Sequence, residues 1–147
     1  MTPRIYTVGT STRTADEFLE VLATFGVRTI ADIRRFPGSS RYPHFTRDVL
    51  AASLRERGTT YAWLGEDLGG YRSGGYGAHC RTEGFARGLS RLESLAASSP
   101  TVILCAERLP WRCHRRFIAS ALRHRGWAVV HIVERDRTVA PAEGQEG

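Results

Sequence analysis

The chain has 147 residues and a formal net charge of +6, and all 21 of its lysine-plus-arginine positions are arginine. This length fits one domain that can bury an ordinary core without disulfides or a structural metal. The charge suits anionic partners, because guanidinium groups bind phosphate and carboxylate through paired donors. No apolar run approaches the roughly 20 residues of a membrane span, and the amino terminus does not resemble a signal peptide. We therefore expect a cytoplasmic protein with reduced thiols and no membrane partner.

Strands and helices are predicted in strict alternation along the chain. RIYTVG predicts a first strand, and the helix that follows begins with a capping box of Thr14 and Glu17 and ends at Gly26. The later strands are predicted at 27–33, 59–64, 101–106 and 127–133, and the later helices at 46–58, 84–99 and 114–126.

This alternation predicts an α/β fold with about five mostly parallel strands, helices on both faces and right-handed crossovers, in a Rossmann-like three-layer arrangement. We expect a single compact domain over residues 1–133. Residues 134–147 lack an apolar period and are predicted to be a flexible tail.

The connections that leave the predicted strands are long and polar, whereas those that enter strands are short. In open α/β sheets, ligands bind beyond the carboxyl ends of the strands. A functional site is therefore expected at that edge of the sheet.

The segment LCAERLPWRCHRR, residues 104–116, brings the most unusual residues to that edge. Cys105 ends a predicted strand, where it is either a nucleophile activated by a helix terminus or a small core residue. Its spacing to Arg112 is one residue too long for the phosphatase loop. Arg115 falls in a first helical turn, where a cation is unfavourable unless an anion lies beside it. The alternative is that it points to solvent or pairs with Glu107.

Two carboxylates are candidate acid and base groups. Asp32 and Glu107 follow different strands, and if both face one pocket their pKa values would separate for these two roles. The alternative for Asp32 is a salt bridge or a turn cap. With Asp32, Cys105 and Glu107 as catalytic candidates, the predicted substrate-binding or anion-binding residues are Ser11, Arg34, Ser39, Ser40, Cys113, His114 and Arg115.

No cofactor is predicted. The cysteines and histidines at positions 79, 80, 105, 113 and 114 do not have the spacing of a zinc ribbon or finger, so zinc is not expected. The glycine-rich segment 68–80 lacks both the phosphate-loop lysine and the dinucleotide fingerprint, and it is interpreted as a lid or binding loop.

Several motifs together resemble a known family. VGTS, ADIRRFPGSSRYPHF, YAWLGEDLGG, LCAERLPWRCHRR and VVHI are similar to the bacterial and archaeal family called domain of unknown function 488, over about residues 5–132. The most specific parts are Cys105-x-Glu107 followed by Cys113-His114-Arg115, together with Asp-x-Arg at positions 32–34. The resemblance implies a compact α/β domain whose signature residues gather in one pocket, and it leaves the reaction open.

Three functions remain open. The leading hypothesis is a hydrolase or group transferase acting on a phosphate-bearing small molecule, a nucleotide-like compound or a nucleic acid. The second is a nucleic-acid-binding module without catalysis, and the third is a thiol or sulfur-handling protein that uses Cys105 and Cys113. The arginines that would read a nucleic-acid backbone are Arg41, Arg72, Arg115 and Arg123.

Overall fold

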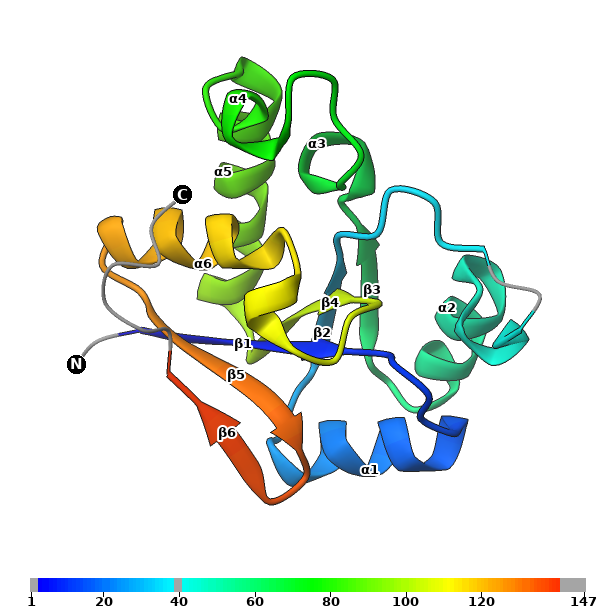
Figure 1. Cartoon of the computed structure of the whole chain (residues 1–147). Coiled ribbons are helices and arrows are strands. Elements are labelled where there is room, and N and C mark those ends of the chain that lie inside the picture. The colour runs from blue at the N-terminus through cyan, green and yellow to red at the C-terminus, as the bar shows by residue number, and fades with distance from the viewer. Residues whose placement is uncertain (1–2, 39–40, 141–147) are drawn as a thin grey trace.

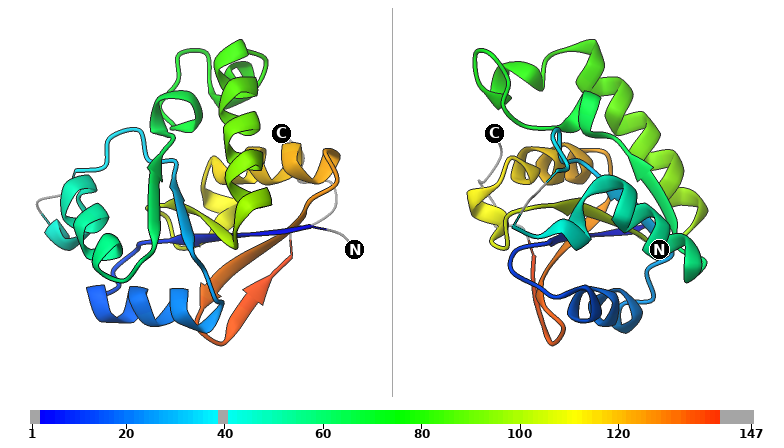
Figure 2. Two further views of the ribbon diagram at one scale, coloured as in Figure 1. Left: turned by 180° about the vertical axis from the view of Figure 1, so that it is seen from behind. Right: turned by 90° about the vertical axis from the view of Figure 1, so that its right-hand side faces the viewer.

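The protein is described by a computed structural model that covers residues 3–38 and 41–140. A six-stranded sheet with the order β3-β2-β4-β1-β5-β6 lies between two layers of helices (Figures 1 and 2). Strands β1 to β5 are all parallel, and β6 pairs antiparallel with β5. The predicted α/β class and the three-layer arrangement are confirmed.

The strands are β1 Arg4–Gly9, β2 Thr29–Asp32, β3 Thr60–Trp63, β4 Thr101–Cys105, β5 Ala128–Glu134 and β6 Arg137–Val139. The helices are α1 Ala15–Thr24, α2 Arg47–Glu56, α3 Gly65–Leu68, α4 Tyr76–His79, α5 Glu83–Ser98 and α6 Arg115–His124. Two short 3-10 turns cover Pro43–Phe45 and Pro110–Arg112. The capping box of Thr14 and Glu17 is present at the start of α1.

The core consists of two apolar clusters, one on each face of the sheet. One packs α1 and α2 against the sheet, and the other packs α5 and α6 against the opposite face. Alternation along β4 divides its side chains between them: Val102 and Leu104 face α1 and α2, whereas Ile103 and Cys105 face α5 and α6. The end of β4 therefore delivers Cys105 beside α6.

The end of the chain differs from the predicted tail. Strand β5 continues through Glu134, and Arg137–Val139 returns beside it as β6. The turn residues Arg135 and Asp136 let the chain reverse, and the Arg-Thr-Val segment then pairs with the open edge of β5. The rest of that predicted tail, 141–147, lies outside the described residues.

Gly9 ends β1 opposite Cys105 and brings two loops into contact. A Cβ at position 9 would overlap the backbone carbonyl of Glu107, so only glycine lets the segment after β4 cross the end of β1. The amides of Thr10 and Ser11 then donate to the carbonyls of Cys105 and Ala106, at 2.8 and 2.9 Å. These bonds fix the start of the segment that carries Glu107.

We expect Gly9→Ala to destabilise the fold by about 1 to 3 kcal/mol, because the added methyl group meets backbone atoms that cannot move independently. Urea unfolding monitored by circular dichroism measures this loss. Gly38→Ala is the matched control, since a Cβ there meets nothing within 4 Å. Equal stability of the two variants would show that the segment after β4 yields easily.

Candidate functional site

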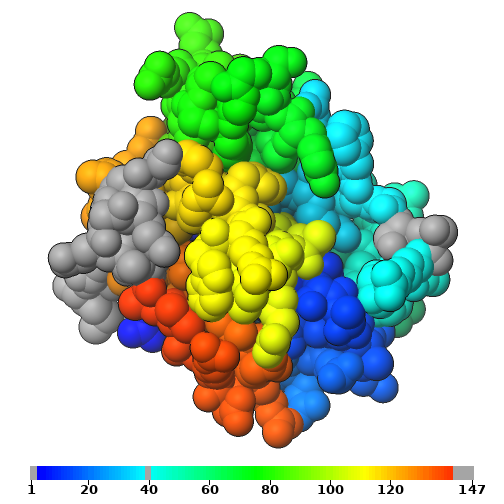
Figure 3. All heavy atoms as spheres, viewed as in Figure 1, coloured from blue at the N-terminus to red at the C-terminus, as the bar shows by residue number. Residues whose placement is uncertain are grey.

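A cleft of about 880 Å³ opens at the carboxyl ends of the strands. Its walls come from three parts of the chain: residues 34–36 after β2, residues 70–72 and 75–76, and residues 105–107 and 112–114. In Figure 3 the cyan, green and yellow segments that contain these residues meet on the face toward the viewer. The predicted site edge is thus an edge at which a cleft lies.

Two thiols form the floor of the cleft. Cys105 ends β4, and Cys113 follows the Pro110–Arg112 turn, so the two cysteines approach from separate elements. Their Sγ atoms lie 3.2 Å apart, within hydrogen-bond distance, and both cysteines are free thiols. Cys105 is 1% exposed and Cys113 is 7% exposed. Cys113 is therefore the more accessible sulfur.

Arg115 lies beneath the thiol pair and is fully buried. Its Nη1 donates to Cys105 Sγ at 3.0 Å, and its Nη2 donates to the Arg108 carbonyl at 2.9 Å. Its Nε is buried and has no hydrogen-bond partner, and no carboxylate pairs with it among residues 3–38 and 41–140. A buried cation needs a nearby anion, and the adjacent sulfurs are the groups placed to supply one.

The pKa values of the two thiols are shifted in opposite directions. The pKa of Cys113 is lowered, first by its hydrogen bond with Cys105 and further by His114 and the Arg115 amide. The pKa of Cys105 is raised, chiefly by burial and then by its contact with Cys113. These directions favour a Cys113 thiolate that accepts a hydrogen bond from the protonated Cys105 thiol. The Arg115 guanidinium then contacts this charged pair through the Cys105 sulfur.

His114 lies between the thiols and the opposite wall. Its Nδ1 is 3.7 Å from Cys113 Sγ, and its Nε2 is buried without a hydrogen-bond partner among the described residues. The Tyr76 ring meets its imidazole edge to face at 4.8 Å. A Cβ on Gly70 would lie 3.2 Å from Nδ1 of the same ring, so a larger residue there would require the imidazole to shift slightly.

Glu107 is the only carboxylate that lines the described part of the cleft. It is partly buried, and its Oε1 accepts from the Leu109 amide at 3.1 Å. No arginine or histidine of the described chain forms an ion pair with it. Glu107 is thus available for proton transfer in the cleft.

The prediction that Asp32 and Glu107 face one pocket does not agree with the position of Asp32. Register pairs it with Leu104, so it points toward α1 and α2, on the face opposite to Cys105 and α6. Arg34 binds both its oxygens, at 2.9 and 2.8 Å, and the Tyr61 hydroxyl donates to it as well. The expectation of a shared pocket is wrong, and the alternative of a salt bridge describes the geometry.

This ion pair anchors the loop after β2. Arg34 Nη1 donates to the Phe45 carbonyl at 2.6 Å, which joins the end of β2 to the segment before α2. Burial and the neighbouring carboxylate raise the pKa of Tyr61. Although Arg34 borders the cleft, its guanidinium is already bound to Asp32 and the Phe45 carbonyl.

Of the three predicted serines, Ser11 lies within the described residues. Ser11 has a positive φ of 50° and bonds through its amide to the segment after β4, but it does not line the cleft. Ser39 and Ser40 lie outside the described residues.

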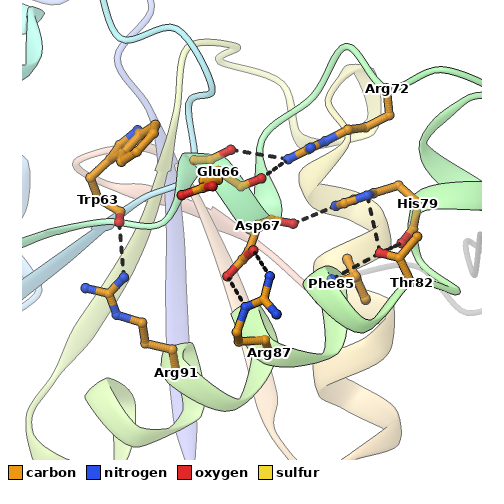
Figure 4. Close-up of polar contacts among 10 residues, drawn as sticks. Trp63, Glu66, Asp67, Arg72, His79, Thr82, Phe85, Arg87 and Arg91 are labelled. Carbon is orange, nitrogen blue, oxygen red and sulfur yellow. Dashed lines mark hydrogen bonds and ion pairs between the residues drawn. The ribbon is translucent and has the colours of Figure 1, made fainter.

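The glycine-rich segment after α3 forms the outer wall of the cleft. Arg72 donates to the carbonyls of Gly69 and Glu66, and the Tyr76 hydroxyl donates to the Leu68 carbonyl at 2.6 Å. His79 and Arg87 both contact Asp67, through its carbonyl and its carboxylate respectively (Figure 4). Sequence reasoning did not identify Tyr76, Arg35 and Arg112 as wall residues. The only pattern that could have indicated them is the presence of tyrosines and arginines in the polar loops after the strands.

Within the described ranges, no group of three or more His, Cys, Asp or Glu residues is arranged to hold a metal ion. None of the helices described is both long and apolar enough to span a bilayer.

The fold and cleft define a three-layer α/β protein with a thiol pair at the carboxyl ends of its strands. The family described as domain of unknown function DUF488 matches residues 14–122, and the chain belongs to this family. A comparison with curated proteins finds no match.

We expect Asp32→Asn to destabilise the protein by about 3 kcal/mol or more, because it leaves the largely buried Arg34 guanidinium without its charged partner. Thermal and urea unfolding measure this effect. Asp67→Asn is the control: its partner Arg87 is 67% exposed, so the loss should stay below about 1 kcal/mol. A stable Asp32→Asn variant would show that the ion pair is not needed to hold the loop after β2.

Proposed function

We propose that the protein is a thiol-dependent hydrolase or group transferase that acts on an anionic, phosphate-bearing or nucleotide-like substrate, with Cys113 as its nucleophile. The observation that carries the proposal is the buried Arg115 guanidinium beside two thiols and no described carboxylate. This arrangement favours a thiolate, which is the reactive form of cysteine. The sequence named Cys105 as a candidate nucleophile or core residue, and the deeper burial and raised pKa of Cys105 favour Cys113 as the nucleophile.

The charge of the cleft supports an anionic substrate. The cleft is bordered by Arg35, Arg72 and Arg112 and by the single carboxylate of Glu107, whereas the charge of Arg34, also at its wall, is balanced by Asp32. Arg112 is exposed, and no carboxylate of the described residues pairs with it. A substrate anion near Arg35 and Arg112 would present its electrophilic atom toward the Cys113 sulfur. Such guanidinium contacts both hold and orient the reacting group.

Proton transfer has two candidates in the cleft. Attack by the Cys113 thiolate forms a covalent intermediate and leaves a group that needs a proton. Glu107 and His114 are the titratable side chains beside that position. One of them could protonate the leaving group and the other could activate the incoming acceptor.

The alternative of a nucleic-acid-binding module is less well supported. Arg115, which was expected to contact the nucleic-acid backbone, is 0% exposed and cannot reach a phosphate on the protein surface. Arg72 is occupied by backbone carbonyls of α3 and its flanking residues. Under this proposal, a nucleic acid supplies the anionic group only where its terminal nucleotide enters the cleft.

We expect iodoacetamide to alkylate Cys113 faster than Cys80, and the ratio of rates to grow as the pH falls from about 8 to about 6. The thiolate reacts, so lowering the pKa of Cys113 preserves its rate in this range, whereas burial raises the pKa of Cys80 and suppresses its rate. Peptide mass spectrometry after timed quenching gives both rates.

Arg115→Met should reduce the ratio by removing the cation beside the thiols. Arg125→Met is its control, because Arg125 pairs with Glu93 at the surface of the last helix. Labelling of Cys113 that requires unfolding would identify it as a core thiol and overturn the proposal.

We expect Arg112→Gln to weaken binding of adenosine 5′-monophosphate by roughly three- to tenfold, since a charge-assisted contact in a partly open site contributes about 0.6 to 1.4 kcal/mol. Isothermal titration calorimetry with wild type, Arg112→Gln and the distant exposed control Arg57→Gln measures this difference. Inorganic phosphate in a parallel titration separates recognition of the anion from recognition of the nucleoside. Equal affinities for the two variants would place the anion elsewhere.

A further inference from the structure

We propose that Cys105 and Cys113 are a redox modification site: a peroxide oxidises Cys113, and Cys105 then closes an intramolecular disulfide. The proposal rests on the same Cys113 sulfur as the proposed function but needs no substrate turnover. The chain contains one other cysteine, Cys80, which is half-buried and not paired with either thiol.

The geometry places the two sulfurs for direct bonding. Their separation of 3.2 Å must shorten to about 2.05 Å, a shift of roughly 1 Å. Cys105 sits at the end of a buried strand, whereas Cys113 lies between a short 3-10 turn and the start of α6. The segment 106–112 between them is partly exposed, so the closing movement falls mainly on Cys113 and its turn.

The chemistry proceeds in two balanced steps. The Cys113 thiolate attacks one peroxide oxygen, the O–O bond breaks, and the departing hydroxide takes a proton to become water. This leaves a sulfenic acid on Cys113. The Cys105 sulfur then attacks the Cys113 sulfur and its proton leaves with the hydroxyl group as a second water. Two electrons pass from the two thiols to hydrogen peroxide, the named oxidant.

The surroundings of the two cysteines indicate which thiol reacts with peroxide and which one closes the disulfide. Cys113 borders the cleft and is the sulfur that a peroxide reaches first. Cys105 is almost fully buried, and Arg115 Nη1 lies 3.0 Å from its sulfur. This guanidinium stabilises the negative charge that develops on Cys105 as it loses its proton. Cys105 is therefore the resolving thiol, which explains a second cysteine that the nucleophile alone does not require.

The disulfide would have a direct consequence for the cleft. It removes the thiolate from Cys113 without adding oxygen to the sulfur, so a thiol reductant restores the original state. Without the resolving cysteine, excess peroxide would carry Cys113 on to irreversible sulfinic acid. Oxidation should thus switch off nucleophilic chemistry at this site reversibly.

The test treats the full chain with equimolar hydrogen peroxide, alkylates the remaining thiols with iodoacetamide and digests with trypsin. Arginines separate the two cysteines into the peptides 92–108 and 113–115, so a disulfide appears as one linked species. We expect this species, alkylation of Cys80 alone among the three cysteines, and recovery of all three thiols with dithiothreitol.

Matched variants assign the order of events. Cys105→Ser should trap Cys113 as a sulfenic acid that dimedone labels, Cys113→Ser should give neither product, and Cys80→Ser should behave as wild type. Cys105→Ala replaces the serine variant if that protein does not fold. Over-oxidised Cys113 without the linked species in wild type, or a bond to Cys80, would overturn the proposal.

The proposed function fails separately. Rapid alkylation of Cys113 without a disulfide rejects only the redox site. A disulfide in a protein that binds neither adenosine 5′-monophosphate nor phosphate rejects only the anionic substrate.

Discussion

The buried charge of Arg115 is the constraint on which the site depends. Its guanidinium contacts the sulfur at the end of β4 and the carbonyl of Arg108, while its own amide meets Cys113. One side chain thus joins a strand, the segment that follows it and the start of α6. A cation at a helix amino terminus is unfavourable unless an anion lies nearby, and the thiol pair is the group that is placed to supply one.

The carboxyl edge of the sheet serves two purposes because side chains alternate between its faces. Toward α1 and α2, Asp32 and Arg34 form a closed ion pair that holds the loop after β2. Toward α5 and α6, the thiols open into a cleft bordered by Arg35 and Arg112, neither of which forms an ion pair within the described part of the chain. The Asp32–Arg34 pair neutralises its own charges, whereas the arginines at the cleft are available to bind an anionic ligand.

The outer wall of the cleft is built by a segment with little regular structure. The side chains of Arg72 and Tyr76 donate hydrogen bonds to backbone carbonyls in and beside α3. The Asp67–Arg87 ion pair links α3 to α5. The Tyr76 ring in turn packs on His114. The wall therefore positions the imidazole beside Cys113 while it closes one side of the cleft.

The order of strands and helices, the α/β class and the edge that carries the site follow from the sequence, because apolar periodicity is local and parallel strands end at one edge. Cys113, His114 and Glu107, which line the described cleft, were named as candidates from the residues that follow the fourth predicted strand. Sequence patterns could not place Asp32 on the opposite face from Cys105, since that depends on the register of β2 against β4. Nor could they bury Arg115 beneath two sulfurs, because the path of residues 106–112 and the docking of α6 arise only from packing between segments distant in the chain.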